Sequence, residues 1–333
     1  MANENGTQQA YEIIIVGAGP AGQTAALYGG RSRIPTLVLE RGIPGGQLWN
    51  TAEVEDYPGF EHIMGPDLAD RIQKHAEKFG ATFETGAEVV SVSADGDDRV
   101  VRTADGREFR APAVIITAGG EARKLGVPGE EELAGKGVSY CAVCDGAFFE
   151  GADIAVVGGG DSAVEEGTFL TRYGNKVSVI HRRDAWRAQP ILVEQMRATG
   201  KVDEVMNTVV DEIHGTDGRV SHLTVRNVET DEQSELPVTA IFPFVGFTPH
   251  SDIFDPDLAV QIELDESGHI VTDQAMRTAV PGIFAAGDVR SQFVRQITNA
   301  VGDATTAALA AHQYVEQLKH ERRGKAEPGQ QAA

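Results

Sequence analysis

The two cysteines of this 333-residue chain are separated by two residues, in the segment Cys141-Ala142-Val143-Cys144. This spacing lets the thiols close a small-ring disulfide and favours a lowered thiol pKa, which promotes exchange with other disulfides. One pair cannot build the disulfide framework of a small secreted protein or fill a structural zinc site, so no metal is expected. The alternative is a pair of inert, buried cysteines. Asp145 follows directly and is either a proton relay or a turn residue.

A glycine-rich motif lies near the N-terminus, at Gly17-Ala18-Gly19-Pro20-Ala21-Gly22. It follows the apolar segment Tyr11–Val16, a predicted buried strand, and a helix and a second strand at Thr36–Glu40 come after it. In such a βαβ unit the glycines allow a tight turn, a close approach to a pyrophosphate and close packing of helix on strand. Glu40 ends the second strand, where its carboxylate can bind ribose hydroxyls. The motif therefore predicts a dinucleotide site.

The same pattern occurs again after the cysteine pair. A predicted strand at Asp153–Val157 runs into Gly158-Gly159-Gly160-Asp161-Ser162-Ala163, and the next strand is predicted at Lys176–Ile180. At the position that corresponds to Glu40 stands His181, and the basic residues Arg182, Arg183 and Arg187 follow it. Arginines can bind a 2′-phosphate bidentately, whereas a carboxylate would repel it. The second dinucleotide is therefore predicted to be NADPH rather than NADH, the alternative being a solvated basic turn.

Further strands are expected where apolar segments end in glycine. These segments are Ala113–Thr117, Thr239–Val245 and Gly282–Ala286, the last of which is followed by Gly287-Asp288. Strands that alternate with helices predict an α/β fold with two Rossmann-like, dinucleotide-binding domains. The polar stretch from His320 onward is expected to be frayed.

Composition narrows the classes of function. The hydrophobic fraction of 41% is ordinary for a globular protein, and no apolar run approaches the ~18 residues of a membrane span. The polar N-terminus lacks a signal-peptide pattern, so we expect a cytoplasmic protein without a membrane partner. The net charge of −21 disfavours nucleic-acid binding. It indicates either an ordinary acidic surface or adaptation to high salt, and the second is favoured.

Together these residues resemble the low-molecular-weight thioredoxin reductases, and the resemblance covers nearly the whole chain. The segments that carry it are GAGPAG at 17–22, GGQL at 45–48, CAVCDG at 141–146, GGGDSAVEE at 158–166, HRRDAWRA at 181–188, FAAGDV at 284–289 and RQITNAVGDA at 295–304. The larger disulfide reductases carry their cysteine pair shortly after the first glycine motif, where this chain has none.

The resemblance implies a homodimer in which an FAD domain is split by an inserted NADPH domain. The expected boundaries are 1–120 and 250–333 for the FAD domain and 121–249 for the NADPH domain that carries the cysteines. The residues expected to hold FAD are Gly17, Gly19, Pro20, Ala21, Gly22, Glu40, Gly46, Gln47, Asp288, Arg295 and Gln296. Those expected to hold NADPH are Gly158, Gly160, Asp161, Ser162, Ala163, His181, Arg182, Arg183 and Arg187.

The implied activity is hydride transfer from NADPH to FAD, reduction of the Cys141–Cys144 disulfide, and exchange with thioredoxin or a similar small redox protein. In the family the second cysteine, here Cys144, lies nearest the flavin and Asp145 handles protons. The alternatives are a flavin thiol oxidase, a ferredoxin-type flavoprotein reductase and a redox-sensing protein that only holds FAD. One departure is Asp303-Ala304, where a small neutral pair is usual. The extra acid either alters the flavin potential or faces solvent.

Overall fold

A computed structural model describes residues 11–51 and 53–326. The chain forms two compact units, one of which is inserted into the sequence of the other. The split unit comprises Met1–Glu121 and Pro249–Ala333, and the inserted unit comprises Ala122–Thr248. The predicted α/β class, with one domain interrupted by another, is confirmed. The two connecting segments, β10 (Gly120–Ala122) and β18 (Phe247–Pro249), pair with each other as a two-stranded sheet.

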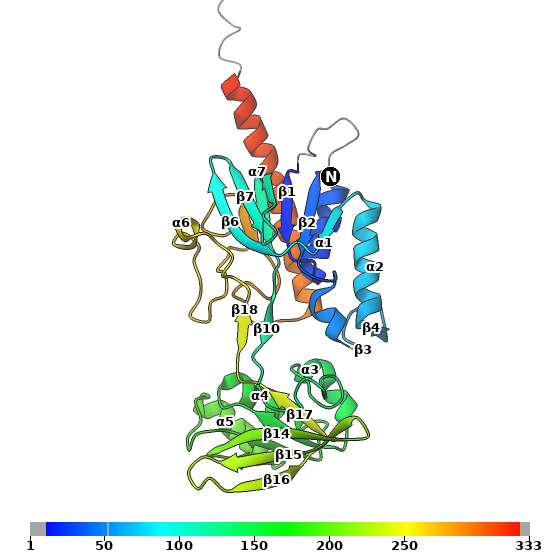
Figure 1. Ribbon diagram of the computed structural model, residues 1–333, viewed down its shortest axis with the longest axis vertical. Coiled ribbons are helices and arrows are strands. Elements are labelled where there is room, and N and C mark those ends of the chain that lie inside the picture. The colour runs from blue at the N-terminus through cyan, green and yellow to red at the C-terminus, as the bar shows by residue number, and fades with distance from the viewer. Residues whose placement is uncertain (1–10, 52, 327–333) are drawn as a thin grey trace, which may run out of the picture. The chain divides into compact units, whose positions relative to one another are not determined.

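The split unit is built on a five-stranded parallel sheet (Figure 1). In spatial order its strands are β19 (Ile283–Ala285), β9 (Ala113–Ile116), β1 (Ile13–Val16), β2 (Thr36–Glu40) and β5 (Thr82–Thr85). Apolar side chains leave both faces of the sheet and both faces are covered, which is why the strands other than the edge strand β5 are largely hydrophobic runs. Helices α1 (Pro20–Arg31) and α7 (Ile297–Ala326) cover one face.

The opposite face of this sheet packs against an antiparallel three-stranded sheet and the loops around it. The sheet consists of β6 (Val89–Asp95), β7 (Asp98–Thr103) and β8 (Glu108–Ala111). The remaining elements of the split unit are η1 (Gly46–Asn50), β3 (Glu53–Val54), β4 (Ile63–Met64), α2 (Gly65–Lys78) and α6 (Pro256–Ala259).

The inserted unit has the same three layers as the split unit, which are helices, a parallel sheet and an antiparallel sheet. Its parallel sheet has four strands. Its strands in spatial order are β13 (Val202–Val205), β12 (Lys176–Ile180), β11 (Asp153–Val157) and β17 (Ala240–Pro243). One face packs on α3 (Ala142–Asp145), η2 (Gly146–Phe149), α4 (Asp161–Leu170) and α5 (Pro190–Ala198). The other face packs on the antiparallel sheet of β14 (Thr208–Thr216), β15 (Arg219–Asn227) and β16 (Gln233–Pro237) (Figure 1).

The end of the chain corrects one expectation. Fraying was predicted from His320 onward, but helix α7 continues to Ala326, and residues 327–333 lie outside the described part. Side chains at and just before the start of this stretch contact the body of the split unit. Lys319 Nζ contacts Glu12 Oε2 at 2.7 Å, and Arg322 contacts Asp97 Oδ2 at 3.2 Å and Asp98 Oδ1 at 3.3 Å.

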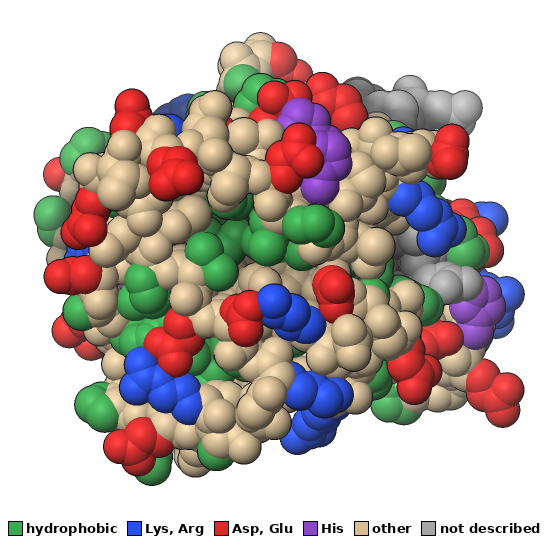
Figure 2. Space-filling model, turned by 90° about the horizontal axis from the view of Figure 1, so that it is seen from below, with side chains coloured by type: hydrophobic (Ala, Val, Ile, Leu, Met, Phe, Trp, Pro, Cys, Tyr) green, Lys and Arg blue, Asp and Glu red, His purple; other side chains and the backbone are tan. Residues whose placement is uncertain are grey.

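Carboxylates dominate the charged surface. Figure 2 shows Asp and Glu side chains scattered over the face that it draws, with fewer Lys and Arg among them and no single acidic patch. Among the residues that the structure describes, no helix has the length and apolar character to cross a bilayer. The same residues contain no cluster of three or more His, Cys, Asp or Glu that could hold a metal ion.

Candidate active site

Cys141 and Cys144 form a disulfide at the start of the short helix α3. Cys141 is the N-cap of this helix, and its Sγ accepts a hydrogen bond from the backbone N–H of Cys144 at 3.2 Å. Both cysteines are half-buried, whereas Val143 between them is 47% exposed. The disulfide is therefore neither an inert core bridge nor a loop crosslink on the open surface.

Ser139, which the sequence analysis did not single out, organises the polar contacts around the disulfide. It is buried, and its backbone N–H donates to Ile241 O on β17 at 3.0 Å. Its hydroxyl donates to Asp145 Oδ2 at 2.5 Å and accepts from the backbone N–H of Cys141 at 3.2 Å. Asp145 is thereby connected to Cys141 through one hydroxyl group. A serine two residues before the first cysteine was the available signal, because such hydroxyls bond backbone groups two residues on.

The first glycine motif leaves no room for side chains at the turn into α1. A Cβ at Gly22 would lie 1.9 Å from Gly17 O, and one at Gly17, where φ is +97°, would lie 2.7 Å from Thr117 O. Gly19, the N-cap of α1, provides no side-chain cap, and Pro20 begins the helix. The first-turn N–H groups are therefore available to an anion, as a bound pyrophosphate requires.

The other residues expected to hold FAD gather around this turn. Glu40 accepts hydrogen bonds from the N–H groups of Ala18 at 2.7 Å and Gly42 at 2.8 Å. Gly46 lies directly against Gly19, since a Cβ on Gly46 would be 3.0 Å from the Cα of Gly19. Gln47 Nε2 donates to Gly120 O at 3.1 Å, beyond the end of β9.

The segment that follows β19 reaches the same edge of the sheet. A Cβ on Gly287 would lie 3.0 Å from the Cβ of Ala21, which places Asp288 beside the start of α1. Arg295 Nη2 contacts His269 Nε2 at 2.8 Å, and Gln296 directly precedes α7. A dinucleotide with its pyrophosphate at α1 therefore has polar groups on both sides.

Asp303, the acidic residue at a position where the family usually has a small neutral one, is buried and not exposed to solvent. Asp303 is 7% exposed, and its Oδ2 accepts from Arg290 Nη1 at 3.1 Å and from the N–H of Gly287 at 3.3 Å. It therefore holds the turn that carries Asp288 and does not face solvent. Burial, against the attraction of Arg295 and with a contribution from the charge of Asp303, raises the pKa of Asp288 to about 6.

The second glycine motif repeats this construction in the inserted unit. A Cβ at Gly158 would lie 2.5 Å from Phe244 O and 2.6 Å from the Cβ of Ala163. Gly160 is the N-cap of α4 without a side-chain cap, so this helix also presents free N–H groups near the exposed Ser162. Asp161 is occupied within the protein, because its carboxylate accepts from the backbone and side-chain N–H groups of Gln189 at 2.8 and 3.2 Å.

The basic residues after β12 divide into two kinds. Arg182, Arg183 and Arg187 are exposed, and none has a carboxylate partner among the described residues. His181 is 5% exposed and lies beneath Gly159, where a Cβ would be 2.1 Å from its imidazole ring. The arginines are thus available to a phosphate, whereas the ring of His181 is packed inside the unit.

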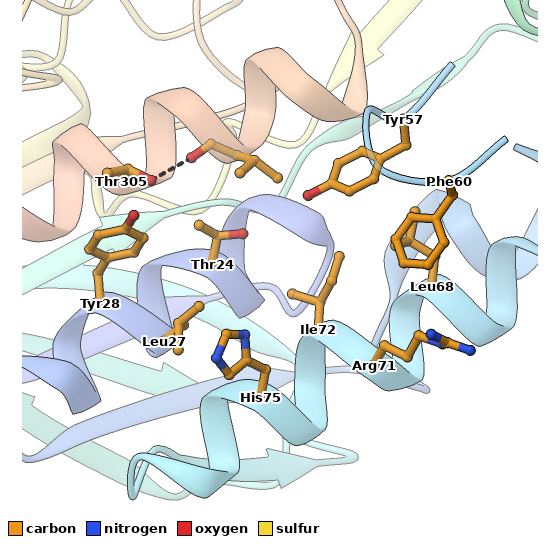
Figure 3. A pocket seen from close by; sticks show the side chains of 11 residues that line it. Thr24, Leu27, Tyr28, Tyr57, Phe60, Leu68, Arg71, Ile72, His75 and Thr305 are labelled. Atoms are coloured by element: carbon orange, nitrogen blue, oxygen red, sulfur yellow. Dashed lines mark hydrogen bonds between the residues drawn. The ribbon is translucent and has the colours of Figure 1, made fainter. Parts of the chain in front are cut away.

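A separate pocket of about 290 Å³ in the split unit lies among helices α1, α2 and α7 (Figure 3). Its walls are mainly aromatic and aliphatic, and none of the residues expected to bind a dinucleotide lines it. The lining residues are Thr24, Leu27, Tyr28, Tyr57, Phe60, Leu68, Arg71, Ile72, His75, Val301 and Thr305. The pocket is therefore distinct from both predicted dinucleotide sites and from the disulfide.

The raised pKa of Asp288 predicts a pH effect on the ligand-free protein. The folded state holds the proton of Asp288 up to pH ~6, whereas the unfolded chain releases it near pH ~4, so stability falls as pH rises through this window. Asp288→Asn removes this cost. At pH 7.5 the free energy of unfolding of the variant should be ~2–3 kcal/mol higher than that of the parent, and at pH 4 the two values should be about equal. Urea unfolding at the two pH values measures the difference.

Asp265→Asn is the matched control, because the pKa of Asp265 is shifted in the opposite direction to that of Asp288. Burial favours the neutral form of Asp265, but hydrogen bonds from the His269 backbone, Ser291 and the Ser267 backbone outweigh burial and lower its pKa to about 2. Asp265 therefore stabilises the fold above pH ~4, and this contribution is lost as pH falls towards 2. An Asp288→Asn variant that is less stable than the parent at pH 7.5 would contradict the assigned desolvation.

Comparisons with known proteins place this geometry in a family. Residues 11–304 match the family described as pyridine nucleotide-disulphide oxidoreductase. The chain is 50% identical to the thioredoxin reductase of Bacillus subtilis over 312 residues, which cover 94% of this chain and 97% of the relative. It is 44% identical to the thioredoxin reductase of Streptomyces coelicolor, with 95% and 97% covered. The crystal structure of the Streptococcus pyogenes thioredoxin reductase superimposes with a TM-score of 0.87 at 46% identity, covering 93% of this chain and all of that one.

The relatives match the chain across both units, and the cysteine pair, the two glycine turns and the split architecture agree with the sequence expectation. The family uses FAD and NADPH to reduce a disulfide. This chain belongs to the thioredoxin reductases, within the pyridine nucleotide-disulphide oxidoreductase family.

Proposed function

We propose that this protein reduces the disulfide of thioredoxin, or of a thioredoxin-like protein, with electrons that come from NADPH through FAD. The observation that carries the proposal is the half-buried Cys141–Cys144 disulfide, which opens a helix in the same unit as the second glycine turn. A ferredoxin-type reductase would not need this pair. A thiol oxidase would not need the exposed arginines that follow β12.

In this proposal the split unit holds FAD and the inserted unit holds NADPH. The pyrophosphate of FAD would lie at the N-terminus of α1, with Glu40 on a ribose and with Asp288 and Gln296 beyond the pyrophosphate. The free N–H groups, the absence of space for a Cβ at the turn and the carboxylates around it support this assignment. FAD, when bound, takes a hydride from NADPH and supplies two electrons to a disulfide.

The residues that bind NADPH would be those of the second turn. The N-terminus of α4 would bind the pyrophosphate, and Arg182, Arg183 and Arg187 would bind the 2′-phosphate by charge-assisted hydrogen bonds. Asp161 and His181, which the sequence also suggested, would act indirectly, because their polar atoms bond to Gln189 and Ala185 within the protein.

The disulfide step involves the chain's own residues. Reduction breaks the S–S bond of Cys141 and Cys144, and one thiolate then attacks a sulfur of the thioredoxin disulfide, whose S–S bond breaks as a mixed disulfide forms. The second cysteine displaces the partner's thiol, the internal disulfide forms again, and two electrons have passed to thioredoxin. Asp145, positioned by Ser139, would accept and return the proton that a thiol of the pair loses and gains.

Three properties of the assembly and its setting complete the proposal. Resemblance to the family supports a homodimer, which sedimentation equilibrium of the holoenzyme tests directly. A single protomer mass over the micromolar range would contradict it.

A cytoplasmic location is in keeping with a redox-active pair of this kind. Adaptation to high salt is supported by the excess of 50 acidic over 29 basic residues and by the scatter of carboxylates over the face that Figure 2 draws.

Cysteine substitution tests the function. Cys144→Ser should abolish NADPH-dependent reduction of thioredoxin, because no disulfide remains to receive electrons, while reduction of the bound flavin by NADPH persists as the internal control. The measurements are thioredoxin thiols formed and flavin absorbance under anaerobic conditions. Turnover of thioredoxin by the variant at the parental rate would exclude the pair as the redox centre. NADPH consumption by the parent that requires oxygen but not thioredoxin would instead indicate an oxidase.

Salt adaptation makes a separate prediction for stability. The Debye length falls from ~8 Å at 0.15 M to ~3 Å at 1 M, so molar KCl should screen repulsion among carboxylates and raise the melting temperature. The variant Glu229→Lys with Glu232→Lys, in an exposed loop, should melt higher than the parent at low salt and gain less from KCl. Equal melting temperatures of the parent at 0.15 M and 2 M KCl would contradict the adaptation.

A further inference from the structure

The loop that carries the basic cluster, residues 181–188, is fixed to the protein at both ends. The backbone N–H groups of Arg187 and Ala188 both donate to Gly159 O, at 2.8 and 3.1 Å, and Arg183 O accepts from the N–H of Asn207 at 3.1 Å. The first contact joins the loop to the glycine turn itself. The position of the arginines relative to the pyrophosphate site therefore depends on how the middle of this loop is held.

His181 and Trp186 support the middle of the loop as a pair of stacked rings. Their centroids are 5.5 Å apart and their planes differ by 10°. The Nε2 of His181 lies 3.2 Å from Ala185 O, so it is the protonated nitrogen and donates across the loop. Burial lowers the pKa of His181 and the nearby arginines lower it too, against the hydrogen bond to Ala185 O, so the surroundings disfavour the charged form of the ring.

Trp186 is in turn anchored to the neighbouring strand. Its indole Nε1–H donates to Glu204 Oε2 on β13 at 3.0 Å. Glu204 also accepts from Arg197 of α5, through Nε at 2.5 Å and Nη2 at 2.7 Å, and this pairing lowers its pKa, so the acceptor of the indole hydrogen bond is ionised. Trp186 thus connects the stacked pair to strand β13 of the parallel sheet.

We propose that Trp186, held by Glu204, is a positioning residue that sets the preference for NADPH over NADH. The inference rests on the proposed function, in which Arg182, Arg183 and Arg187 bind the 2′-phosphate. Arginine side chains lose considerable rotamer freedom when they bind, so a contact gains affinity when the loop that carries them is already ordered. Trp186 supplies that order while its indole N–H donates to Glu204.

An ordinary packing role predicts a different result. If Trp186 only fills space, its loss disturbs the glycine turn and the loop together, and both nucleotides bind more weakly by the same factor. If it positions the arginines, only the nucleotide with a 2′-phosphate is affected. The ratio of the two affinities therefore separates the roles, whereas activity or stability alone does not.

The test measures NADP⁺ and NAD⁺ binding to the oxidised holoenzyme by calorimetry, since neither nucleotide reduces the flavin. Trp186→Leu should weaken NADP⁺ binding about three- to tenfold and change NAD⁺ binding by less than about twofold. Trp186→Phe, which keeps the stack and loses the N–H, should fall between the parent and Trp186→Leu. Phe169→Leu, at the far end of α4 in the same unit, is the matched control and should leave the ratio unchanged.

A double arginine variant allows a failure of this proposal to be distinguished from a failure of the proposed function. Arg182→Ala with Arg183→Ala should remove most of the preference for NADP⁺, and adding Trp186→Leu to it should lower the ratio no further. An unchanged ratio in Trp186→Leu, or equal losses for both nucleotides, would overturn the positioning role. A parent enzyme without preference for NADP⁺, or an arginine double variant that keeps the preference, would overturn the NADPH assignment and the positioning role with it.

Discussion

The close approach of a helix to a strand at each glycine turn is the constraint on which both units depend. At Gly22 a single methyl group would overlap the carbonyl oxygen of Gly17, and at Gly158 it would overlap that of Phe244. Because nothing larger than hydrogen is present, α1 and α4 begin directly at the carboxyl edge of a parallel sheet. Their first-turn N–H groups are left without a side-chain cap, so the backbone alone offers donors to an anion. The arrangement of Glu40, Asp288 and the loop of residues 181–188 follows from where these helices begin.

The two units use one backbone device for different ligands. In the split unit carboxylates surround the turn, and the ion pair of Asp303 with Arg290 holds one of them in place. In the inserted unit the same position carries exposed guanidinium groups on a loop that stacked rings support. The inserted unit also carries the disulfide, so the residues proposed to bind NADPH and those proposed to exchange electrons with a partner belong to one compact unit.

Local sequence patterns predicted most of the fold and the order in which the motifs of the site follow one another along the chain. The strands Thr36–Glu40, Asp153–Val157 and Lys176–Ile180 begin and end where expected, because a short apolar run between polar or turn residues indicates a buried parallel strand. The glycine motifs and the cysteine pair were equally visible, because their chemistry requires fixed spacing.

The contacts that escaped sequence reasoning join segments that lie apart in the sequence. Trp186, in the loop after β12, contacts Glu204 on β13, and the buried Asp303 accepts a hydrogen bond from Arg290 of another segment. The basic sequence around His181 suggests that its imidazole contacts a ligand. The structure instead packs this ring beneath Gly159, inside the unit. The helix beyond His320 is likewise stabilised by partners hundreds of residues away, which no local pattern contains.

The central claim is that electrons from NADPH reach the Cys141–Cys144 disulfide through a flavin in the same chain. Anaerobic titration of the FAD-loaded protein with NADPH tests it most directly, with flavin absorbance and free thiols followed together. The account predicts that the protein takes up two electrons more than its flavin alone can hold, and that two thiols per chain appear as it does so. Uptake that stops when the flavin is reduced, with no thiols formed, would contradict it.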